Sequence, residues 1–452
     1  MHCDMNGYYA SVELLDRPDL VGKPMAVCGN PENRHGIILA KSEEAKKYGI
    51  QTAMTVWQAK KLCPELVLVS PHHHKYRYYS GVINEIYQRY TDMVEPFSVD
   101  ESWLDVTHSQ LLFGDGKTIA DEIRHTVKEE LGLTLSVGVS YNKVFAKMGS
   151  DYKKPDATTV ITRQNYQKLL WPLPVGKMFF VGRATREKLA LYGITTIGEL
   201  AATDRDFLIR LMGKQGAMLS DYTNGRDDSP VTKSYEREKI KSVGNGVTFK
   251  RDLLGEDDVK TALLALSDQV TSRLRSYQMK AGGIKVDIKR PDLSVIFKQH
   301  KLTTPIQTQE EIFAMALFIV KETGFIAKPI RMLTLTGIDL LDEGDVEIQL
   351  NMFGLGEPYS LSTAGGPRGP VDKDEGASGS AISQRRETFT PTASSAEDSL
   401  AKQDKLEELA KTMDAIRGKY GAGSLNYART MDNDIGIDLD MKFEEEINRD
   451  LD

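Results

Sequence analysis

The order of elements predicted for residues 1–165 constrains the fold of this chain most strongly. Five short segments have the apolar, β-branched pattern of strands: 1–5, 93–97, 102–106, 133–140 and 158–161. Four longer segments have the helical spacing of apolar side chains: 8–15, 75–90, 117–131 and 142–152. Once residues 17–70 are set aside, their order is β-α-α-β-β-α-β-α-β, which is close to a split βαβ layout. We therefore expect an antiparallel sheet backed by helices.

Residues 17–70 are expected to form a small inserted subdomain. Within it, Ser42 is a predicted helix N-cap, and Thr55 with Gln58 has the spacing of a capping box. The predicted sheet and its helices would then consist of residues 1–16 and 71–165. The chain has 452 residues, which is too long for one core because domains usually hold roughly 100–200 residues.

The rest of the chain predicts further domains and places the protein in the α+β class. Residues 166–232 are mainly helical, and residues 241–353 combine strands with amphipathic helices. Residues 354–396 are rich in Gly, Ser, Thr and Pro and are expected to be disordered. The tail 354–452 contains one predicted helix, at 397–418, which either binds a partner or folds back.

The net charge of −7 is distributed unevenly along the chain. Residues 397–452 hold 8 basic and 15 acidic residues, so the remainder is neutral as a whole. Two acidic residues accompany eight basic ones in residues 271–301: Arg273, Arg275, Lys280, Lys285, Lys289, Arg290, Lys298 and Lys301. Because a phosphate backbone requires a local basic surface, this segment favours binding of nucleic acid.

Composition also bears on the compartment. No stretch approaches the ~20 apolar residues of a membrane helix, so we expect no membrane segment. The three cysteines, Cys3, Cys28 and Cys63, lack metal-ligand spacing and predict small, buried, reduced side chains. We therefore expect a cytoplasmic protein.

Three carboxylates are the strongest candidates for chemistry. Asp4 ends the first predicted strand, and Asp100 and Glu101 lie at the tip of the predicted hairpin formed by 93–97 and 102–106. Because successive strand residues face opposite sides, Asp100 and Glu101 can share a site only at such a bend. Three carboxylates at close range repel unless cations lie between them, which predicts a site for two Mg²⁺ ions. An isolated Asp-Glu pair is more often a solvated turn, so the surrounding residues decide between the two interpretations.

Three segments around these carboxylates identify a family. Residues 4–13 (DMNGYYASVE), 98–101 (SVDE) with 104–106 (LDV), and 136–147 (SVGVSYNKVFAK) with 154–155 (KP) occur in this order. They resemble the three motifs of the Y-family translesion DNA polymerases, the bacterial polymerase IV and V group. The resemblance extends from residue 1 to about residue 353. It implies a right-hand polymerase with a ferredoxin-like palm, small fingers at 17–70, a helical thumb at 166–232 and a little finger at 241–353.

The resemblance also implies roles for residues of the active site. Metal ligands are expected at Asp4, Asp100 and Glu101, with the backbone carbonyl of Met5 assisting. Tyr9 matches the steric gate that excludes a 2′-hydroxyl. Nucleotide contacts are expected at Tyr8, Tyr9, Lys46 and Lys154. A lone lysine is usually a solvated surface residue, but the motif positions of Lys46 and Lys154 favour a nucleotide contact at both.

Two positions depart from the polymerase IV pattern. Asn6 replaces a second aspartate, and Glu43 stands where a phosphate-binding tyrosine is common. Both departures place the chain nearer polymerase V, whose members often require accessory subunits. Family members also have a longer first strand, so we expect either an earlier start of the chain or a shortened strand.

Several segments predict contacts with DNA and with a clamp. Residues 181–200 resemble a helix-hairpin-helix, in which Gly182 and Arg183 would approach a DNA phosphate, although Phe180 replaces the usual first glycine. Lys241 and Ser242 resemble the entry to the little finger. The DNA-binding residues expected within that domain are Arg273, Arg275, Lys285, Lys289 and Arg290. Residues 349–353 resemble the sliding-clamp pentapeptide, with Gln349, Leu350, Met352 and Phe353 as its contacts.

The sequence therefore predicts a monomeric, error-prone DNA polymerase that extends a primer on template DNA with deoxynucleotides and without proofreading. Two rivals remain open. A nucleotidyl cyclase can use a similar palm and metal pair but needs no DNA grip, and a catalytically silent clamp-associated factor would not need the three carboxylates.

Overall fold

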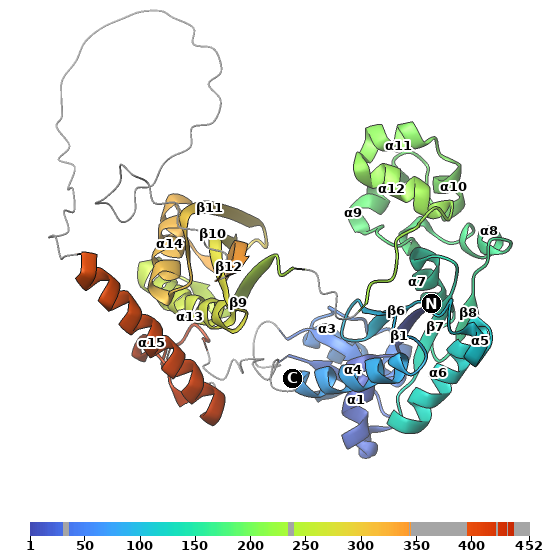
Figure 1. Ribbon diagram of the computed structural model, residues 1–452, viewed down its shortest axis with the longest axis horizontal. Helices are drawn as coiled ribbons and strands as arrows, with labels where there is room; N and C mark the ends of the chain where they lie inside the picture. The colour runs from blue at the N-terminus through green and yellow to red at the C-terminus, as the bar shows by residue number, and fades with distance from the viewer. Residues whose placement is uncertain are drawn as a thin grey trace, which may run out of the picture. The chain divides into compact units, whose positions relative to one another are not determined.

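The computed structural model describes residues 1–29, 36–233, 239–342, 344, 396–421, 424–431 and 433–437. The chain divides into two compact units between residues 239 and 240, and the described residues from 396 onward belong to the second unit. Figure 1 shows the helices and strands of both units. Among the described residues, no helix combines the length and the apolar character needed to cross a membrane.

A five-stranded sheet lies at the centre of the first unit, in the order β5-β6-β1-β7-β8. Its strands are β1 (His2–Met5), β5 (Val94–Pro96), β6 (Glu101–Leu104), β7 (Leu135–Val139) and β8 (Thr158–Val160). The central β1 pairs antiparallel with β6 and β7, while β7 and β8 are parallel. The main helices associated with it are α1 (Tyr8–Asp16), α4 (His73–Gln88), α6 (Gly116–Leu131) and α7 (Lys143–Tyr152), and the short α5 spans Gln110–Phe113. The element order predicted for this region is confirmed.

Alternation along β1 separates its core side chains from its functional ones. Cys3 and Met5 are buried in a cluster with α4 and α6 residues such as Ile86 and Ile119. His2 and Asp4 point to the opposite face, because successive strand residues alternate. Helix α7 packs against β1 and β7 on that face.

Close packing of α7 on the sheet depends on a glycine pair. A Cβ atom at Gly138 of β7 would lie 1.8 Å from the carbonyl oxygen of Ala146 and 2.5 Å from the backbone nitrogen of Ser150. A Cβ atom added at Gly149 would likewise lie 2.9 Å from the Cα atom of Gly138. The absence of both side chains lets the α7 backbone approach β7, so that α7 residues reach the face that carries Asp4.

The insertion forms its own three-stranded sheet, in the order β3-β2-β4. Its elements are β2 (Met25–Cys28), β3 (Ile38–Lys41), β4 (Val67–Val69), α2 (Glu43–Lys47), α3 (Val56–Leu62) and the 3-10 helix η1 (Pro18–Leu20). Ser42 caps α2 by accepting a hydrogen bond from the Ala45 N–H, and Thr55 forms the capping box with Gln58, both as the sequence predicts. Cys28 and Cys63 are buried here, and all three cysteines are free and buried as predicted.

Residues 166–223 are helical, also as predicted. They form α8 (Tyr166–Leu170), η2 (Val175–Lys177), α9 (Arg183–Ala190), α10 (Ile197–Ala202), α11 (Arg205–Met212) and α12 (Lys214–Thr223). Figure 1 shows α9 to α12 gathered in one group. Their apolar residues share a core with Phe145 and Met148 of α7.

The second unit contains a four-stranded antiparallel sheet in the order β11-β10-β12-β9. Its elements are β9 (Ser242–Leu253), β10 (Met279–Lys289), β11 (Val295–Ile306), β12 (Ile330–Asp342), α13 (Gly255–Ser276) and α14 (Gln309–Glu322). Ile284, Val286 and Ile288 of β10 are buried in a core with residues of α13 and α14. The residues between them therefore lie on the opposite, open face of the sheet.

The C-terminal segment folds back onto this second unit, which is one of the two alternatives that the sequence left open. Helix α15 spans Ala396–Tyr420, and η5 spans Ala428–Thr430. Arg417 pairs with Asp268 of α13 at 2.9 Å, and Ile435 and Ile437 are buried in the core of the unit. Part of the tail that was expected to be largely disordered is thus packed, because it brings two apolar side chains and matching charges to the domain.

Candidate active site

Pairing of β1 with β6 places two of the three candidate carboxylates side by side. Asp4 and Glu101 are direct partners across the two strands. Asp100 lies in the turn just before β6, and its carbonyl oxygen accepts a hydrogen bond from the Met5 N–H at 3.0 Å. The predicted position of Asp100 and Glu101 at the end of a hairpin is therefore confirmed, since β5 and β6 form that hairpin.

Two lysines neutralise the carboxylates. Lys147 of α7 places its Nζ 2.7 Å from Glu101 Oε2 and 3.6 Å from Asp4 Oδ2. Lys154 Nζ lies 2.7 Å from Asp4 Oδ2 and 2.9 Å from Asp151 Oδ1. Lys154 was predicted as a triphosphate contact, and in this structure it lies directly at the carboxylates.

Burial and these lysines act in opposite directions on the carboxyl groups. Burial raises the pKa of Asp4 to about 6, although Lys154 acts to lower it. Burial would also raise the pKa of Glu101, but contacts with His2 and Lys147 together lower it to about 2. Glu101 is thus held as a carboxylate, while Asp4 is the harder of the two to ionise.

Asp100 differs from the other two in where its carboxylate points. Its Oδ1 accepts a hydrogen bond from Ser98 Oγ at 2.6 Å within the turn. Accordingly, no three His, Cys, Asp or Glu side chains converge as a ready metal site anywhere in the part of the chain that the structure describes. The structure brings the side chains of Asp4 and Glu101 together. Asp100 is linked to β1 through its backbone carbonyl oxygen, which accepts from the Met5 N–H.

The donor set nevertheless fits divalent cations such as Mg²⁺. Asp4, Asp100 and Glu101 offer the hard carboxylate oxygens that Mg²⁺ prefers. The ammonium groups of Lys147 and Lys154 lie at Glu101 and Asp4, so this position already attracts positive charge. Asp4, Glu101 and neighbouring Asp100 are therefore the residues that could hold metal.

The two tyrosines predicted to contact nucleotide have different environments. The Tyr9 ring stacks on Tyr76 with centroids 3.9 Å apart, and Tyr76 in turn donates a hydrogen bond to the buried Glu13 at 2.5 Å. Tyr8 is buried, and its hydroxyl donates to the Tyr76 carbonyl oxygen at 2.6 Å. The Tyr8 ring lies in the apolar core beneath the sheet, so the predicted nucleotide contact at Tyr8 would have to come from its backbone.

Lys46 is placed on the insertion. Its ammonium pairs with Glu43 at 3.3 Å, and about half of its side chain is exposed, 54% by relative area. The Glu43 side chain that departs from the family pattern is thus its partner. Lys46 remains a predicted phosphate contact.

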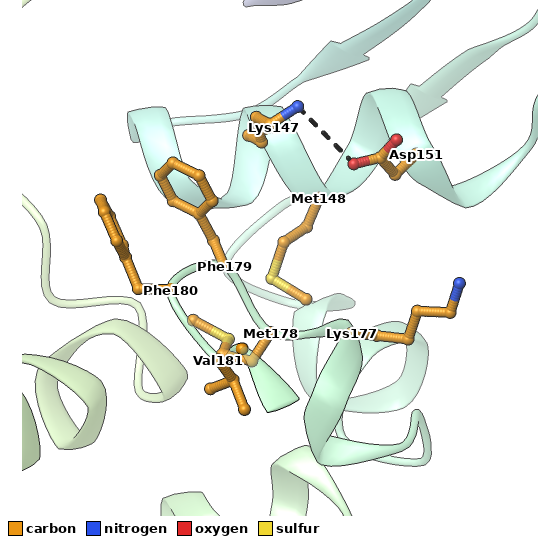
Figure 2. A pocket seen from close by; sticks show the side chains of 9 residues that line it. Lys147, Met148, Asp151, Lys177, Met178, Phe179, Phe180 and Val181 are labelled. Atoms are coloured by element: carbon orange, nitrogen blue, oxygen red, sulfur yellow. Dashed lines mark ion pairs between the residues drawn. The ribbon is translucent and has the colours of Figure 1, made fainter. Parts of the chain in front are cut away.

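A hollow next to the carboxylates leads toward the helix-hairpin-like turn. It encloses about 340 Å³ and is lined by Lys147, Met148 and Asp151 of α7 and by residues 177–182. Figure 2 shows Lys147 and Asp151 on one side of this hollow and Phe179 and Phe180 on another. Phe180 has φ +67°, a left-handed conformation that explains why the motif usually has glycine there. Gly182 is the N-cap of α9, and Arg183 begins that helix and is largely exposed.

In the second unit, the predicted DNA-binding residues fall on two sides of the sheet. Lys285 and Lys289 lie on the open face of β10, because they alternate with the buried Ile284, Val286 and Ile288. Phe297 of β11 lies on this face too, opposite Asp287, with Lys285 Nζ 5.0 Å from its ring.

The other predicted DNA contacts occupy different positions. Ser242 begins β9, Lys241 precedes it and Arg290 follows β10. Arg273 of α13 donates to the Gly244 carbonyl oxygen at 3.2 Å. Arg275 is mostly buried and pairs with Asp414 of α15 at 2.7 Å. Its prediction as a DNA contact is wrong, because the tail helix covers it. The clamp-like residues Gln349, Leu350, Met352 and Phe353 lie outside the described residues.

Sequence reasoning missed three residues at the carboxylates: His2, Lys147 and Ser150. Fully buried His2 has Nδ1 2.8 Å from Ser150 Oγ and Nε2 3.4 Å from Glu101 Oε2. Burial lowers the pKa of His2 to about 4. The available signal was spacing, because His2 lies two residues before Asp4 on the same strand and must share its face.

The fold matches a solved structure over most of its length. A solved Y-family DNA polymerase chimera covers 75% of this chain, and the match spans 98% of that chain, with a TM-score of 0.68 and 22% sequence identity. Together with the carboxylates at the centre of a mostly antiparallel sheet, this defines the class of the fold as a right-hand polymerase.

Two family models and two similar proteins identify the family within this class. The impB/mucB/samB family model matches residues 3–151, and the model of its C-terminal domain matches residues 240–352. DNA polymerase IV of Acetivibrio thermocellus is 47% identical over 353 residues, which are 78% of this chain and 88% of the relative. DNA polymerase IV 1 of Bacillus subtilis is 39% identical over 358 residues, 79% of this chain and 85% of the relative. The chain belongs to the impB/mucB/samB family of Y-family DNA polymerases.

These relatives also bear on the two departures from the family pattern. Asn6 and Glu43 had indicated a position nearer polymerase V, whereas both relatives are named DNA polymerase IV. That interpretation is not supported. In this structure the Asn6 amide bonds to Ser136 and Thr134, and thus has a structural role of its own.

Proposed function

We propose that this protein extends a DNA primer on a template by adding deoxynucleotides, including opposite damaged bases. The primer 3′-hydroxyl attacks the α-phosphate of the nucleotide and pyrophosphate leaves. Two Mg²⁺ ions, when bound, supply charge neutralisation and activate the attacking oxygen. Asp4, Asp100 and Glu101 would hold them, with the Met5 carbonyl assisting, and catalysis is otherwise positioning and electrostatics.

One observation carries this proposal. Asp4 and Glu101 face each other across β1 and β6, and each is neutralised by an ammonium group within 2.7 Å. A pair of carboxylates, one buried and one partly buried, that attracts positive charge is well suited to bind metal and nucleotide together. A simple structural ion pair would not require two carboxylates and two lysines at one place.

The nucleotide would be selected and held by residues around this pair. The Tyr9 ring is fixed by its stack on Tyr76 and acts as the steric gate against a 2′-hydroxyl. Lys154 and Lys46 would bind the triphosphate, Lys154 by leaving Asp4 when metal takes over its charge.

DNA would be held by contacts with its phosphates. Gly182 and Arg183 offer backbone N–H groups and a cation at the start of α9, and Lys147 lines the adjacent hollow. On the second unit, the open sheet face carries Lys285 and Lys289, with Arg290 just beyond it. Such contacts are independent of sequence and weaken as salt rises. The roles of Lys241, Ser242 and Arg273 in this grip are part of the same proposal.

The proposed function also assigns the domains, the clamp contact and the compartment of the protein. Residues 1–16 and 71–165 would be the palm, 17–70 the fingers, 166–232 the thumb and 241–353 the little finger. Gln349, Leu350, Met352 and Phe353 would bind a sliding clamp. The protein would act in the cytoplasm as a monomer and without proofreading.

Primer extension with dNTPs and Mg²⁺ tests the proposal directly. Wild-type protein should extend a primer on undamaged and abasic templates, and more extensively when the clamp is present. The double variant Asp100→Ala, Glu101→Ala should not extend it. A nucleotidyl cyclase or a silent clamp-associated factor would show no extension even as wild type. Extension by the double variant would show that the carboxylate assignment is wrong.

A further inference from the structure

His2 is the buried polar side chain nearest to Glu101 that the proposed mechanism does not use. It is fully buried, and its ring lies with its edge toward Trp103 at 5.2 Å between centroids. Strand pairing sets His2 opposite Trp103 and Asp4 opposite Glu101, so His2 is the diagonal neighbour of Glu101 on the same face. Its position is therefore fixed by the sheet.

Both ring nitrogens of His2 face polar atoms. Nδ1 lies 2.8 Å from Ser150 Oγ of α7, and Nε2 lies 3.4 Å from Glu101 Oε2. His2 Nε2 and Glu101 Oε2 are both buried; Nε2 has no hydrogen-bond partner of good geometry, while Oε2 also meets the Lys147 Nζ at 2.7 Å. Two such atoms facing each other are costly unless one donates to the other.

The Ser150 hydroxyl permits the required arrangement of protons. Ser150 Oγ lies 2.8 Å from both the Lys147 carbonyl oxygen and His2 Nδ1, and its single proton goes either to the carbonyl oxygen, with Oγ accepting from Nδ1–H, or to Nδ1. If the hydroxyl donates to Nδ1, the ring proton lies on Nε2 and points at Glu101. The opposite tautomer would set a nitrogen lone pair against a carboxylate oxygen in a buried site, which is unfavourable. The Nε2–H is therefore directed at Glu101.

We propose that His2 is a positioning residue that holds one oxygen of Glu101 inward, so that the carboxylate presents its other oxygen to a metal ion. Lys147 approaches the same oxygen, Oε2, at 2.7 Å and reinforces this orientation. Hydrogen bonds of this kind to a ligating carboxylate typically change metal affinity or activity by roughly 10–100-fold. The inference rests on the proposed function, because it assumes that Glu101 binds metal.

The test measures Mn²⁺ binding to the full-length protein without DNA, by the electron paramagnetic resonance signal of free Mn²⁺. His2→Met removes the donor and keeps an apolar side chain of similar size in the buried position. His2→Gln is the matched control, since its amide nitrogen can occupy the place of Nε2. We expect His2→Met to weaken binding by roughly 10–100-fold, and His2→Gln to bind nearly as wild type.

A second readout separates positioning from simple packing. In primer extension, His2→Met should raise the Mg²⁺ concentration needed for half-maximal rate, while the rate at saturating Mg²⁺ stays much closer to wild type. Its thermal unfolding midpoint in EDTA should match that of His2→Gln. If His2→Met fails to fold, His2→Asn takes its place, because it too lacks a donor at Nε2.

Two outcomes would contradict the role of His2, and a third would contradict the metal site itself. Equal Mn²⁺ affinity in wild type and the variant without a donor would overturn the inference. Equal losses in His2→Met and His2→Gln, with equal loss of stability, would also overturn it and assign His2 to packing. Absence of Mn²⁺ binding by wild type would instead refute the proposed metal site itself.

Discussion

Lys154 Nζ lies 2.7 Å from Asp4 Oδ2, an ion pair between α7's C-terminal flank and the central strand. The pair compensates the charge of a carboxylate that is only 4% exposed. Compensation is incomplete, because burial still raises the pKa of Asp4 to about 6. The active site therefore stores a destabilising charge in the metal-free protein.

This relationship predicts that Asp4→Asn stabilises the metal-free protein. A carboxyl whose pKa is raised on folding binds more protons in the folded state between its unfolded value, 3.8, and about 6. Stability consequently falls as pH rises through this window. At pH 7.5 in EDTA the substitution should add up to about 3 kcal/mol to the free energy of unfolding.

The pH dependence provides the control for Asp4→Asn. At about pH 4 Asp4 is protonated in the folded state and about half protonated in the unfolded state, so most of the stabilisation should have vanished there. Urea unfolding at pH 7.5 and near pH 4 measures both values. A destabilised variant at pH 7.5 would contradict the prediction. Primer extension should be lost, as expected where stability is traded for activity.

Tyr9→Ala is expected to admit ribonucleotides. Removing the ring that stacks on Tyr76 opens the space that a 2′-hydroxyl would occupy. The ratio of kcat/KM for dNTP over rNTP should fall at least about tenfold. Tyr8→Phe is the control, because the Tyr8 hydroxyl bonds only inside the core, to the Tyr76 carbonyl oxygen. It should cost about 1–3 kcal/mol of stability and leave sugar selectivity unchanged.

Gly138→Ala should severely destabilise the first unit. The new Cβ would lie 1.8 Å from the Ala146 carbonyl oxygen, so α7 would have to move away from the sheet. We expect a loss of more than about 3 kcal/mol, with Lys147 and Ser150 displaced from the carboxylates. Gly81→Ala on α4 meets nothing within 4 Å and should instead stabilise by about 0.5–1 kcal/mol. Thermal unfolding compares them, and a stable Gly138→Ala protein would argue against the close approach.

Arg417→Ala should loosen the second unit. Arg417 is nearly fully buried and pairs with Asp268, so its removal leaves a poorly exposed carboxylate without that partner. Breaking such a pair typically costs about 3–5 kcal/mol. Hydrogen exchange of α13 peptides measures the effect. Arg429→Ala removes an exposed pair with Asp257 and should cost less than about 1 kcal/mol. Equal protection in the two variants would mean that α15 does not stabilise α13.

The sequence by itself determined the order of the elements and the location of the principal carboxylates. Periodicity and capping residues are local, so Ser42, the Thr55–Gln58 box and the hairpin before Glu101 could be predicted. Residue alternation along β1 likewise set the face of Asp4. The family motifs then pointed to the right class of enzyme.

Only the tertiary structure decided which groups surround those carboxylates and which predicted contacts are occupied by other partners. Lys147 meets Glu101, and Ser150 meets His2, because Gly138 and Gly149 let α7 approach the sheet closely. Tyr8 points into the core, and Arg275 pairs with Asp414 from 139 residues further along the chain. Such contacts depend on packing between segments distant in sequence, and local patterns carry no information about which distant side chain will arrive.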